Sequence, residues 1–145
     1  MPTAIDPELL VRIQARFNAL GDGQPNNLSG VYADDVEFID PAHRVVGRAQ
    51  LEASFDRLDR NVRSLRFDFD PAFGSDADLA LPWTMHLELK RPRRTIVLPG
   101  ISHLRIEDGL VVFHRDHFDL GAMLYEHVPV LGSLVRVVKR ALQTQ

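Results

Sequence analysis

The spacing of the apolar residues changes near residue 61, and this change limits the folds that the chain can adopt. Before it, apolar residues recur every three or four positions in two segments, 7–20 and 48–60, which is typical of amphipathic helices. After it, Leu65, Phe67 and Phe69 alternate with charged residues, as in a half-buried strand. Helices followed by a run of strands predict an α+β domain with the helices on one face of a curved sheet.

Local signals divide the chain into elements. Asp6-Pro7-Glu8 combines an N-cap acid with proline at the first helical position, so the first helix starts here. A short second helix is predicted over 28–32, and Asp108-Gly109 is a tight hairpin signal. The predicted strands cover residues 36–40, 65–69, 80–90, 95–107 and 110–118.

The end of the chain differs in character from the rest. We expect residues 1–127 to form one domain, and residues 128–145 to form a C-terminal amphipathic helix that packs on the domain or on a partner subunit. A basic amphipathic helix can also lie on an anionic membrane, and three cations indicate this alternative only weakly. The apolar stripe comprises Leu131, Leu134, Val135, Val138 and Leu142, and the cations are Arg136, Lys139 and Arg140.

Composition excludes several classes of function. The formal net charge is −3, so there is no basic excess to neutralise phosphates, and we expect no nucleic-acid partner. The chain has no cysteine, which excludes disulfides, thiolate metal sites and a cysteine nucleophile. We predict no metal, because the histidines lack diagnostic ligand spacing, and we expect no cofactor. Without a signal peptide or an apolar run of about 18 residues, a cytoplasmic location is expected.

Alternation within the strands sorts side chains between the two faces of the sheet, because residues two apart share a face. It places four polar candidates on the concave, otherwise apolar face: Asp40, Ser102, His114 and Asp116. An apolar cavity with a few convergent polar groups is a general feature of small-molecule sites. The expected pocket lining comprises Phe38, Phe55, Trp83, Met85, Leu104 and Phe118.

Each polar candidate also has a purely structural explanation. Asp40 precedes Pro41 and could cap a turn, Ser102 could be satisfied by the backbone, and His114 and Asp116 could form a structural pair. On the outer face, three histidines are expected at the surface or in an interface: His86, His103 and His117. That face also carries apolar residues that a homodimer contact would cover, namely Val97, Ile101, Val111 and Phe113.

Several motifs resemble the nuclear transport factor two-like superfamily, which includes ketosteroid isomerases and SnoaL-like polyketide cyclases. The resemblance implies a cone-shaped, cystatin-like fold, in which a curved antiparallel or mixed sheet wraps around three N-terminal helices and an apolar pocket, usually in dimers. The motifs are PheAsnAlaLeuGlyAsp (17–22), TyrAlaAspAsp (32–35), AspPro (40–41), Gly47, Phe55 and IleSerHisLeuArgIle (101–106).

The resemblance also implies site residues. Asp40 matches the isomerase base, but the two positions expected to hold oxyanion donors carry Ile13 and Ser102, which argues against a steroid isomerase. Asp116 is the nearest match to the acid–base aspartate of the cyclases. The epoxide-hydrolase pattern is not matched, because it needs an arginine inside the pocket.

Two kinds of function follow as hypotheses. The first is an acid–base isomerase or cyclase that acts on a carbonyl-containing apolar substrate. Asp40 or Asp116 would be the base, His114 would orient it or act as the acid, and Ser102 would be a weak oxyanion donor. The alternative is a non-catalytic module, either for binding a small molecule or for homodimeric interaction.

Overall fold

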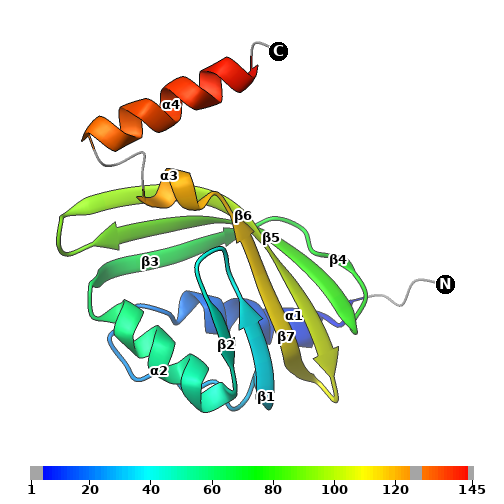
Figure 1. Ribbon diagram of the computed structural model, residues 1–145. Helices are drawn as coiled ribbons and strands as arrows, with labels where there is room; N and C mark the ends of the chain where they lie inside the picture. Colours follow the sequence, from blue (N-terminus) through cyan, green and yellow to red (C-terminus); the bar gives the residue numbers. More distant parts are fainter. Residues whose placement is uncertain (1–4, 125–128, 144–145) are drawn as a thin grey trace.

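The computed structural model describes residues 5–124 and 129–143, and these residues form a mixed α+β fold with an open, curved sheet (Figure 1). The described elements are α1 (Pro7–Asn18), β1 (Tyr32–Ile39), β2 (Arg44–Val46), α2 (Arg48–Asp59), β3 (Val62–Phe69), β4 (Phe73–Gly74), β5 (Asp78–Leu89), β6 (Arg94–Glu107), β7 (Leu110–Phe118), α3 (Leu120–Leu124) and α4 (Pro129–Gln143). As predicted, α1 and α2 precede the long run of strands β3–β7, and β1 and β2 lie between the two helices.

The sheet is mixed. Its strand order is β2-β1-β7-β6-β5-β3, with the short β4 paired to β5. β1 runs parallel to β7, where Phe38 is the register partner of His114, and the other pairs are antiparallel. This single parallel pair brings the start of the domain beside its last strand.

Helix α1 begins and packs as its sequence predicts. The Asp6 side chain accepts a hydrogen bond from the Glu8 N–H at 3.0 Å, which satisfies one of the free amides of the first turn. Leu9, Ile13 and Phe17 are its buried residues, and they belong to the main apolar core beneath the sheet. The apolar spacing of α1 therefore fixes which of its faces meets the sheet.

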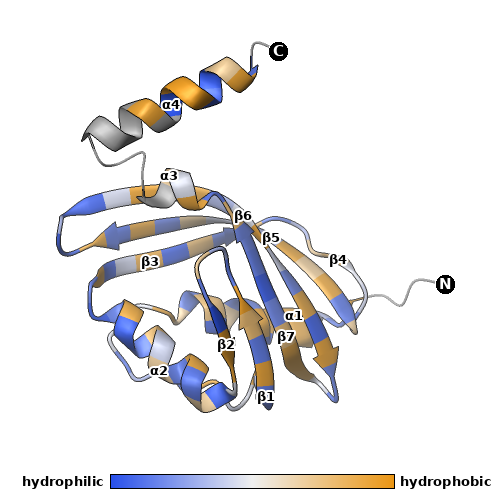
Figure 2. Cartoon of the chain, viewed as in Figure 1, coloured by the Kyte–Doolittle hydropathy of each residue, from blue (hydrophilic) through white to orange (hydrophobic). Residues whose placement is uncertain are grey.

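Alternating burial is clearest on the two longest strands, and Figure 2 shows the alternation of apolar and polar residues along them. The predicted inward faces of β5 and β6 are confirmed. Their buried residues are Leu79, Leu81, Trp83 and Leu87 on β5, and Ile96, Leu98, Ser102, Leu104 and Ile106 on β6.

Three local predictions are wrong. No helix forms over 28–32: residues 28–31 make a turn, and the amides of Val31 and Tyr32 both donate to the Leu28 carbonyl. β1 therefore starts at Tyr32, four residues earlier than expected. Val111 is buried in the core instead of lying on the outer face, because a bulge in β7 shifts the phase of the alternation.

Helix α4 stands apart from the sheet, beyond α3, and carries apolar residues along much of its length (Figures 1 and 2). Leu134, Val138 and Leu142 from the predicted stripe are exposed. An ion pair of 2.7 Å between Lys139 Nζ and Asp119 Oδ2 links α4 to the end of β7. The predicted boundary at 127/128 and the side chains of Leu131 and Val135 lie outside the described part. Within the described ranges, no helix is long and apolar enough to cross a membrane.

Candidate functional site

A chain of side-chain hydrogen bonds crosses the interior of the sheet and ends on Asp116. The Tyr32 hydroxyl lies 2.8 Å from His114 Nδ1, and His114 Nε2 lies 2.6 Å from Asp116 Oδ1. From the other side, Trp83 Nε1 donates to Ser102 Oγ at 2.9 Å, and Ser102 Oγ donates to Asp116 Oδ1 at 2.5 Å. Four strands, β1, β5, β6 and β7, each supply at least one member.

The strand register explains why these residues meet. Ser102 is the register partner of Asp116, so their side chains project together from neighbouring strands. His114 and Asp116 are two residues apart on β7 and share a face. Trp83 lies on β5 opposite Gly100, which leaves room for the indole to reach Ser102.

Most of this polar chain is buried among aromatic rings. Tyr32, Trp83, Ser102 and His114 are all buried, and the His114 ring stacks on Phe17 with a centroid distance of 5.3 Å. Buried polar groups are costly unless they are hydrogen-bonded, so the network stabilises the core only as a complete set. Asp116 is the exception, because 19% of its side chain is exposed.

The environment of Tyr32 keeps its hydroxyl protonated. Burial raises the pKa of Tyr32 far above its ordinary value, and the negative charge of Asp116 raises it further, against a smaller lowering by Arg16. The hydroxyl therefore retains a proton that it can donate.

Two donors converge on one oxygen of Asp116. A serine hydroxyl has one proton, and Ser102 donates it to Oδ1, so Ser102 has no second proton for the oxyanion of a bound molecule. Among the described residues, Asp116 Oδ2 accepts no hydrogen bond. Asp116 is thus a partly exposed carboxylate that is held at Oδ1, with Oδ2 unbonded by any side chain or amide of the described part.

The structure brings Ser102, His114 and Asp116 together but gives Asp40 other partners. Asp40 Oδ1 accepts hydrogen bonds from the amides of Ala42 at 2.8 Å and His43 at 2.7 Å, and it lies 3.3 Å from His43 Nδ1. These contacts close the turn between β1 and β2. Asp40 follows Ile39, the register partner of Arg115, so it lies at the same end of the sheet as Asp116.

The predicted pocket residues pack against one another. Phe38, Trp83 and Leu104 are buried in the main core, and the other three are only partly buried and pack against that core: Phe55, Met85 and Phe118. Phe38 and Phe55 meet edge to face with centroids 5.8 Å apart. Two hollows among the described residues lie on the outside of the molecule, away from this set.

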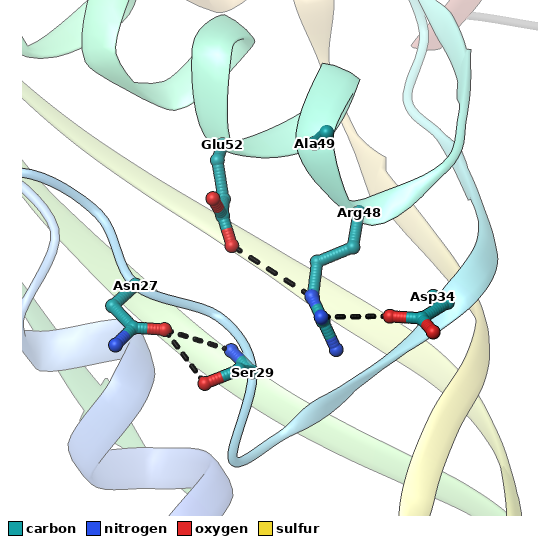
Figure 3. Close-up of a pocket in the computed structure, with 6 residues that line it drawn as sticks. All are labelled: Asn27, Ser29, Asp34, Arg48, Ala49 and Glu52. Carbon is teal, nitrogen blue, oxygen red and sulfur yellow. Dashed lines mark hydrogen bonds and ion pairs between the residues drawn. The ribbon is translucent and has the colours of Figure 1, made fainter.

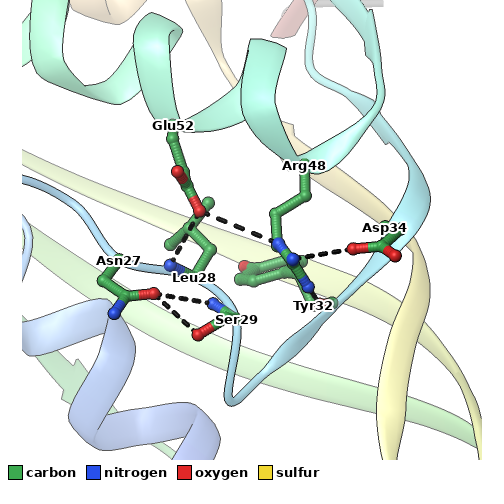
Figure 4. Close-up of polar contacts among 7 residues, drawn as sticks. All are labelled: Asn27, Leu28, Ser29, Tyr32, Asp34, Arg48 and Glu52. Atoms are coloured by element: carbon green, nitrogen blue, oxygen red, sulfur yellow. Dashed lines mark hydrogen bonds and ion pairs between the residues drawn. The ribbon is translucent and has the colours of Figure 1, made fainter.

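The larger hollow, of about 490 Å³, lies between α2 and the turn before β1 (Figure 3). Its central cation, Arg48, is already satisfied: Nη2 lies 2.7 Å from Asp34 Oδ1, and Nη1 donates to the Tyr32 carbonyl at 3.2 Å. Glu52 lies 3.8 Å from Arg48 Nε and accepts from the Leu28 amide (Figure 4). These contacts fasten α2 to β1, and they position Tyr32 at the start of its strand.

Sequence reasoning missed Tyr32 because it assigned this residue to a short helix. A signal was present, because extending the strand back from Val36 and Phe38 in steps of two reaches Tyr32 on the inward face. Within the described residues, no group of three or more histidine, cysteine or acidic side chains could hold a metal ion.

A comparison with protein-family models agrees with the fold. The family model of the SnoaL-like domain matches residues 13–114, and the chain belongs to the SnoaL-like domain family, within the nuclear transport factor two-like superfamily. The predicted resemblance is therefore confirmed. A search of curated proteins gives no match.

Solved structures show the same fold. The chain is similar to an NTF2-like protein of unknown function from Burkholderia pseudomallei, with 19% identity and a TM-score of 0.69 over 82% of this chain and 96% of that chain. It is also similar to a hypothetical protein with a ketosteroid isomerase-like fold from Catenulispora acidiphila, solved with trimethylamine (20%, 0.71, 81% and 90%). A third similar protein, from Jannaschia sp. CCS1, is assigned to the SnoaL-like polyketide cyclases (15%, 0.71, 84% and 94%). At these identities the likeness concerns the fold alone.

Proposed function

We propose that the protein is an acid–base isomerase or cyclase that acts on an apolar, carbonyl-containing small molecule, with Asp116 as the base. The observation that carries this proposal is the state of Asp116. Ser102 and His114 hold Oδ1, while Oδ2 accepts no hydrogen bond within the described part of the chain and the side chain is partly exposed. A carboxylate that is fixed at one oxygen and free at the other is suited to accept a proton from a bound molecule.

The proposed reaction begins with proton transfer. Asp116 Oδ2 takes a proton from the carbon next to the carbonyl group, and the electron pair of that C–H bond forms an enolate. In an isomerisation, Asp116 returns the proton to a different carbon. In a cyclisation, the enolate carbon attacks a second carbonyl, and the protonated Asp116 gives its proton to the new alkoxide. Either sequence regenerates the carboxylate.

The proposal assigns the base to Asp116 rather than to Asp40. Asp40 Oδ1 is occupied by the amides of its own turn, and its contribution is to hold that turn at the end of the sheet. His114 orients the base, since both of its ring nitrogens already have hydrogen-bond partners within the protein.

The test measures exchange at carbon, which requires no knowledge of the product. A panel of apolar ketones is incubated in D₂O, and deuterium incorporation next to the carbonyl is followed by NMR. We expect Asp116→Asn to slow exchange about 100-fold or more, as is common for loss of a general base. Asp40→Asn, the matched control, should stay within a few-fold of wild type. Equal exchange by wild type and Asp116→Asn would refute the assignment.

A non-catalytic binding module is the second candidate. One observation favours it over catalysis: the Ser102 proton is used inside the protein and is not available to a developing oxyanion. A ligand found by screening whose affinity survives Asp116→Asn combined with Asp40→Asn, with no exchange in wild type, would support binding over catalysis.

We also propose that the outer sheet face forms a homodimer contact and that α4 packs on the domain or on the partner subunit. Val97 is 59% exposed on β6, and Ile101 and Phe113 are partly exposed on the same face. Apolar residues gathered on one side of a sheet are typical of a self-association surface.

A further inference from the structure

The hydrogen bonds around His114 leave one arrangement of protons that satisfies every group. An ionised carboxylate can only accept, so the hydrogen on His114 Nε2 points to Asp116 Oδ1 across 2.6 Å. In a neutral ring the other nitrogen, Nδ1, then has to accept, and the Tyr32 hydroxyl lies 2.8 Å away to donate. A neutral ring in these surroundings therefore carries its proton on Nε2.

A doubly protonated ring fits the same surroundings poorly. Its Nδ1–H would donate to the Tyr32 oxygen, and the hydroxyl proton of Tyr32 would then need another acceptor. Within the described residues, His114 is the side chain to which this hydroxyl bonds. Phe17 stacks on the ring, and Phe38 meets it edge-on with centroids 4.8 Å apart. Such rings are poor acceptors, so the extra proton would be left without a partner in the core.

Two titratable side chains hydrogen-bond to this ring. Within the described structure they are Tyr32 on β1 and Asp116 on β7, and Arg16 on α1 acts on Tyr32. β6 contributes the uncharged Leu104, its register partner, and Ser102. The direction of the Tyr32 proton therefore decides which ring nitrogen carries the proton of His114.

We propose that Tyr32 is a positioning residue whose hydroxyl holds His114 as the neutral tautomer protonated at Nε2, so that His114 serves as a fixed hydrogen-bond donor to Asp116. The catalytic consequence rests on the proposed function: His114 keeps Asp116 Oδ1 occupied and leaves proton transfer to Oδ2. The tautomer itself is a property of the folded protein, so it can be tested without a substrate.

The experiment uses the full chain labelled with ¹⁵N in its six histidines. Long-range ¹H–¹⁵N correlation spectra distinguish a protonated from an unprotonated ring nitrogen, and the resonances of His114 are assigned by their loss in His114→Gln. We expect wild type to show an unprotonated Nδ1 and a protonated Nε2 at neutral pH. A wild-type ring protonated on both nitrogens, or on Nδ1 alone, at neutral pH would overturn the proposal.

Tyr32→Phe removes only the hydroxyl. We expect the His114 signals to lose their fixed pattern, either because the two neutral tautomers mix or because Nδ1 gains a proton. Ser102→Ala is the matched control, because it removes the other donor to Asp116 without touching the ring, and it should leave the tautomer unchanged. A Tyr32→Phe spectrum with the wild-type pattern at every pH would show that Tyr32 does not position the ring. If Tyr32→Phe does not fold, the wild-type spectrum still tests the proposal, because a ring without the stated tautomer would overturn it.

Failure of this proposal is distinct from failure of the proposed function. A chain that shows no deuterium exchange with any ketone can still hold His114 in the stated tautomer. Conversely, a chain that loses exchange in Asp116→Asn but carries a doubly protonated His114 keeps the proposed base and loses the role of Tyr32.

Discussion

The indole of Trp83 lies directly against the backbone of Gly100, its register partner across β5 and β6. A Cβ placed on Gly100 would come within 2.3 Å of the indole, which is far inside van der Waals contact. The absence of a side chain at Gly100 is therefore what lets Trp83 lie over β6 and donate to Ser102. The position of the Trp83 indole in the polar chain therefore depends on the bare backbone at Gly100.

Gly100→Ala should destabilise the protein by about 1–3 kcal/mol, the usual cost of forcing extra atoms into a packed core. The measurement is urea unfolding followed by fluorescence of the single tryptophan, whose emission should also change in the folded state. Gly30→Ala is the matched control, since a Cβ there meets nothing within 4 Å, and it should shift stability by less than about 0.5 kcal/mol. Equal effects of the two substitutions would contradict the packing argument.

Asn26 is a buried connector between α1 and α2. Its side chain donates to Asp56 at 2.8 Å and Asp59 at 2.8 Å, and it accepts from Arg16 at 2.6 Å. Asn26→Ala should cost about 2–3 kcal/mol, because it removes the side-chain hydrogen bonds that this buried amide makes with Asp56, Asp59 and Arg16. Thermal or urea unfolding measures this loss, and the exposed Gln24→Ala serves as control, with an expected change below about 0.5 kcal/mol. A cost for Asn26→Ala as small as the control's would refute the connector role.

The outer sheet face can be tested through one residue. If it forms the proposed homodimer contact, Val97→Asp should convert the protein to a monomer, because a charge in an apolar contact would be desolvated without a partner. Sedimentation equilibrium measures the change. Val11→Asp on α1 is the matched control, since Val11 is 64% exposed on another surface, and it should leave the assembly intact. A wild-type monomer at all accessible concentrations would exclude the dimer.

The link between Asp119 and α4 should depend on pH. The hydrogen bond from Lys139 lowers the pKa of Asp119 below its ordinary 3.8, and the Ala122 amide lowers it further. A lowered pKa in the folded state means that this contact stabilises the fold above about pH 4 and is lost as the pH falls through the lowered value. NMR titration of the Asp119 carboxyl in wild type and Lys139→Gln measures it, and the pKa should be higher in the variant. Identical titrations would show that the ion pair does not form in solution.

Periodicity is sufficient to predict most of the architecture. The spacing of Leu9, Ile13 and Phe17 predicts the buried face of α1, and alternation predicts that Ser102 faces the core. These properties are local, because the side-chain direction of a helix or strand residue follows from its position in the repeat. The same rule assigns His114 and Asp116 to the face that Ser102 occupies, and the three side chains do meet there.

The remaining features depend on contacts that periodicity does not encode. Alternation gives the direction of the Asp40 Cβ atom, but its carboxylate rotates to accept amides of its own turn, as short acidic side chains commonly do. The partner of His114, Tyr32, lies 82 residues earlier in the chain and depends on the parallel pairing of β1 with β7. Whether the interior is open or filled depends on how Phe38 and its neighbours pack.

The pairing of β1 with β7 also affects folding during synthesis, because the two strands leave the ribosome at different times. Tyr32 leaves the ribosome about 4 to 16 s before His114, at ordinary synthesis rates of about 5–20 residues per second. Throughout that interval β1 has an unpaired edge on the side that β7 will occupy. Contacts of such long sequence separation form slowly, because the chain loses the entropy of closing a long loop before the contact stabilises it. A nascent chain that stops short of β7 therefore contains Tyr32 but lacks His114 and Asp116. The buried chain of hydrogen bonds cannot form until β7 has been synthesised.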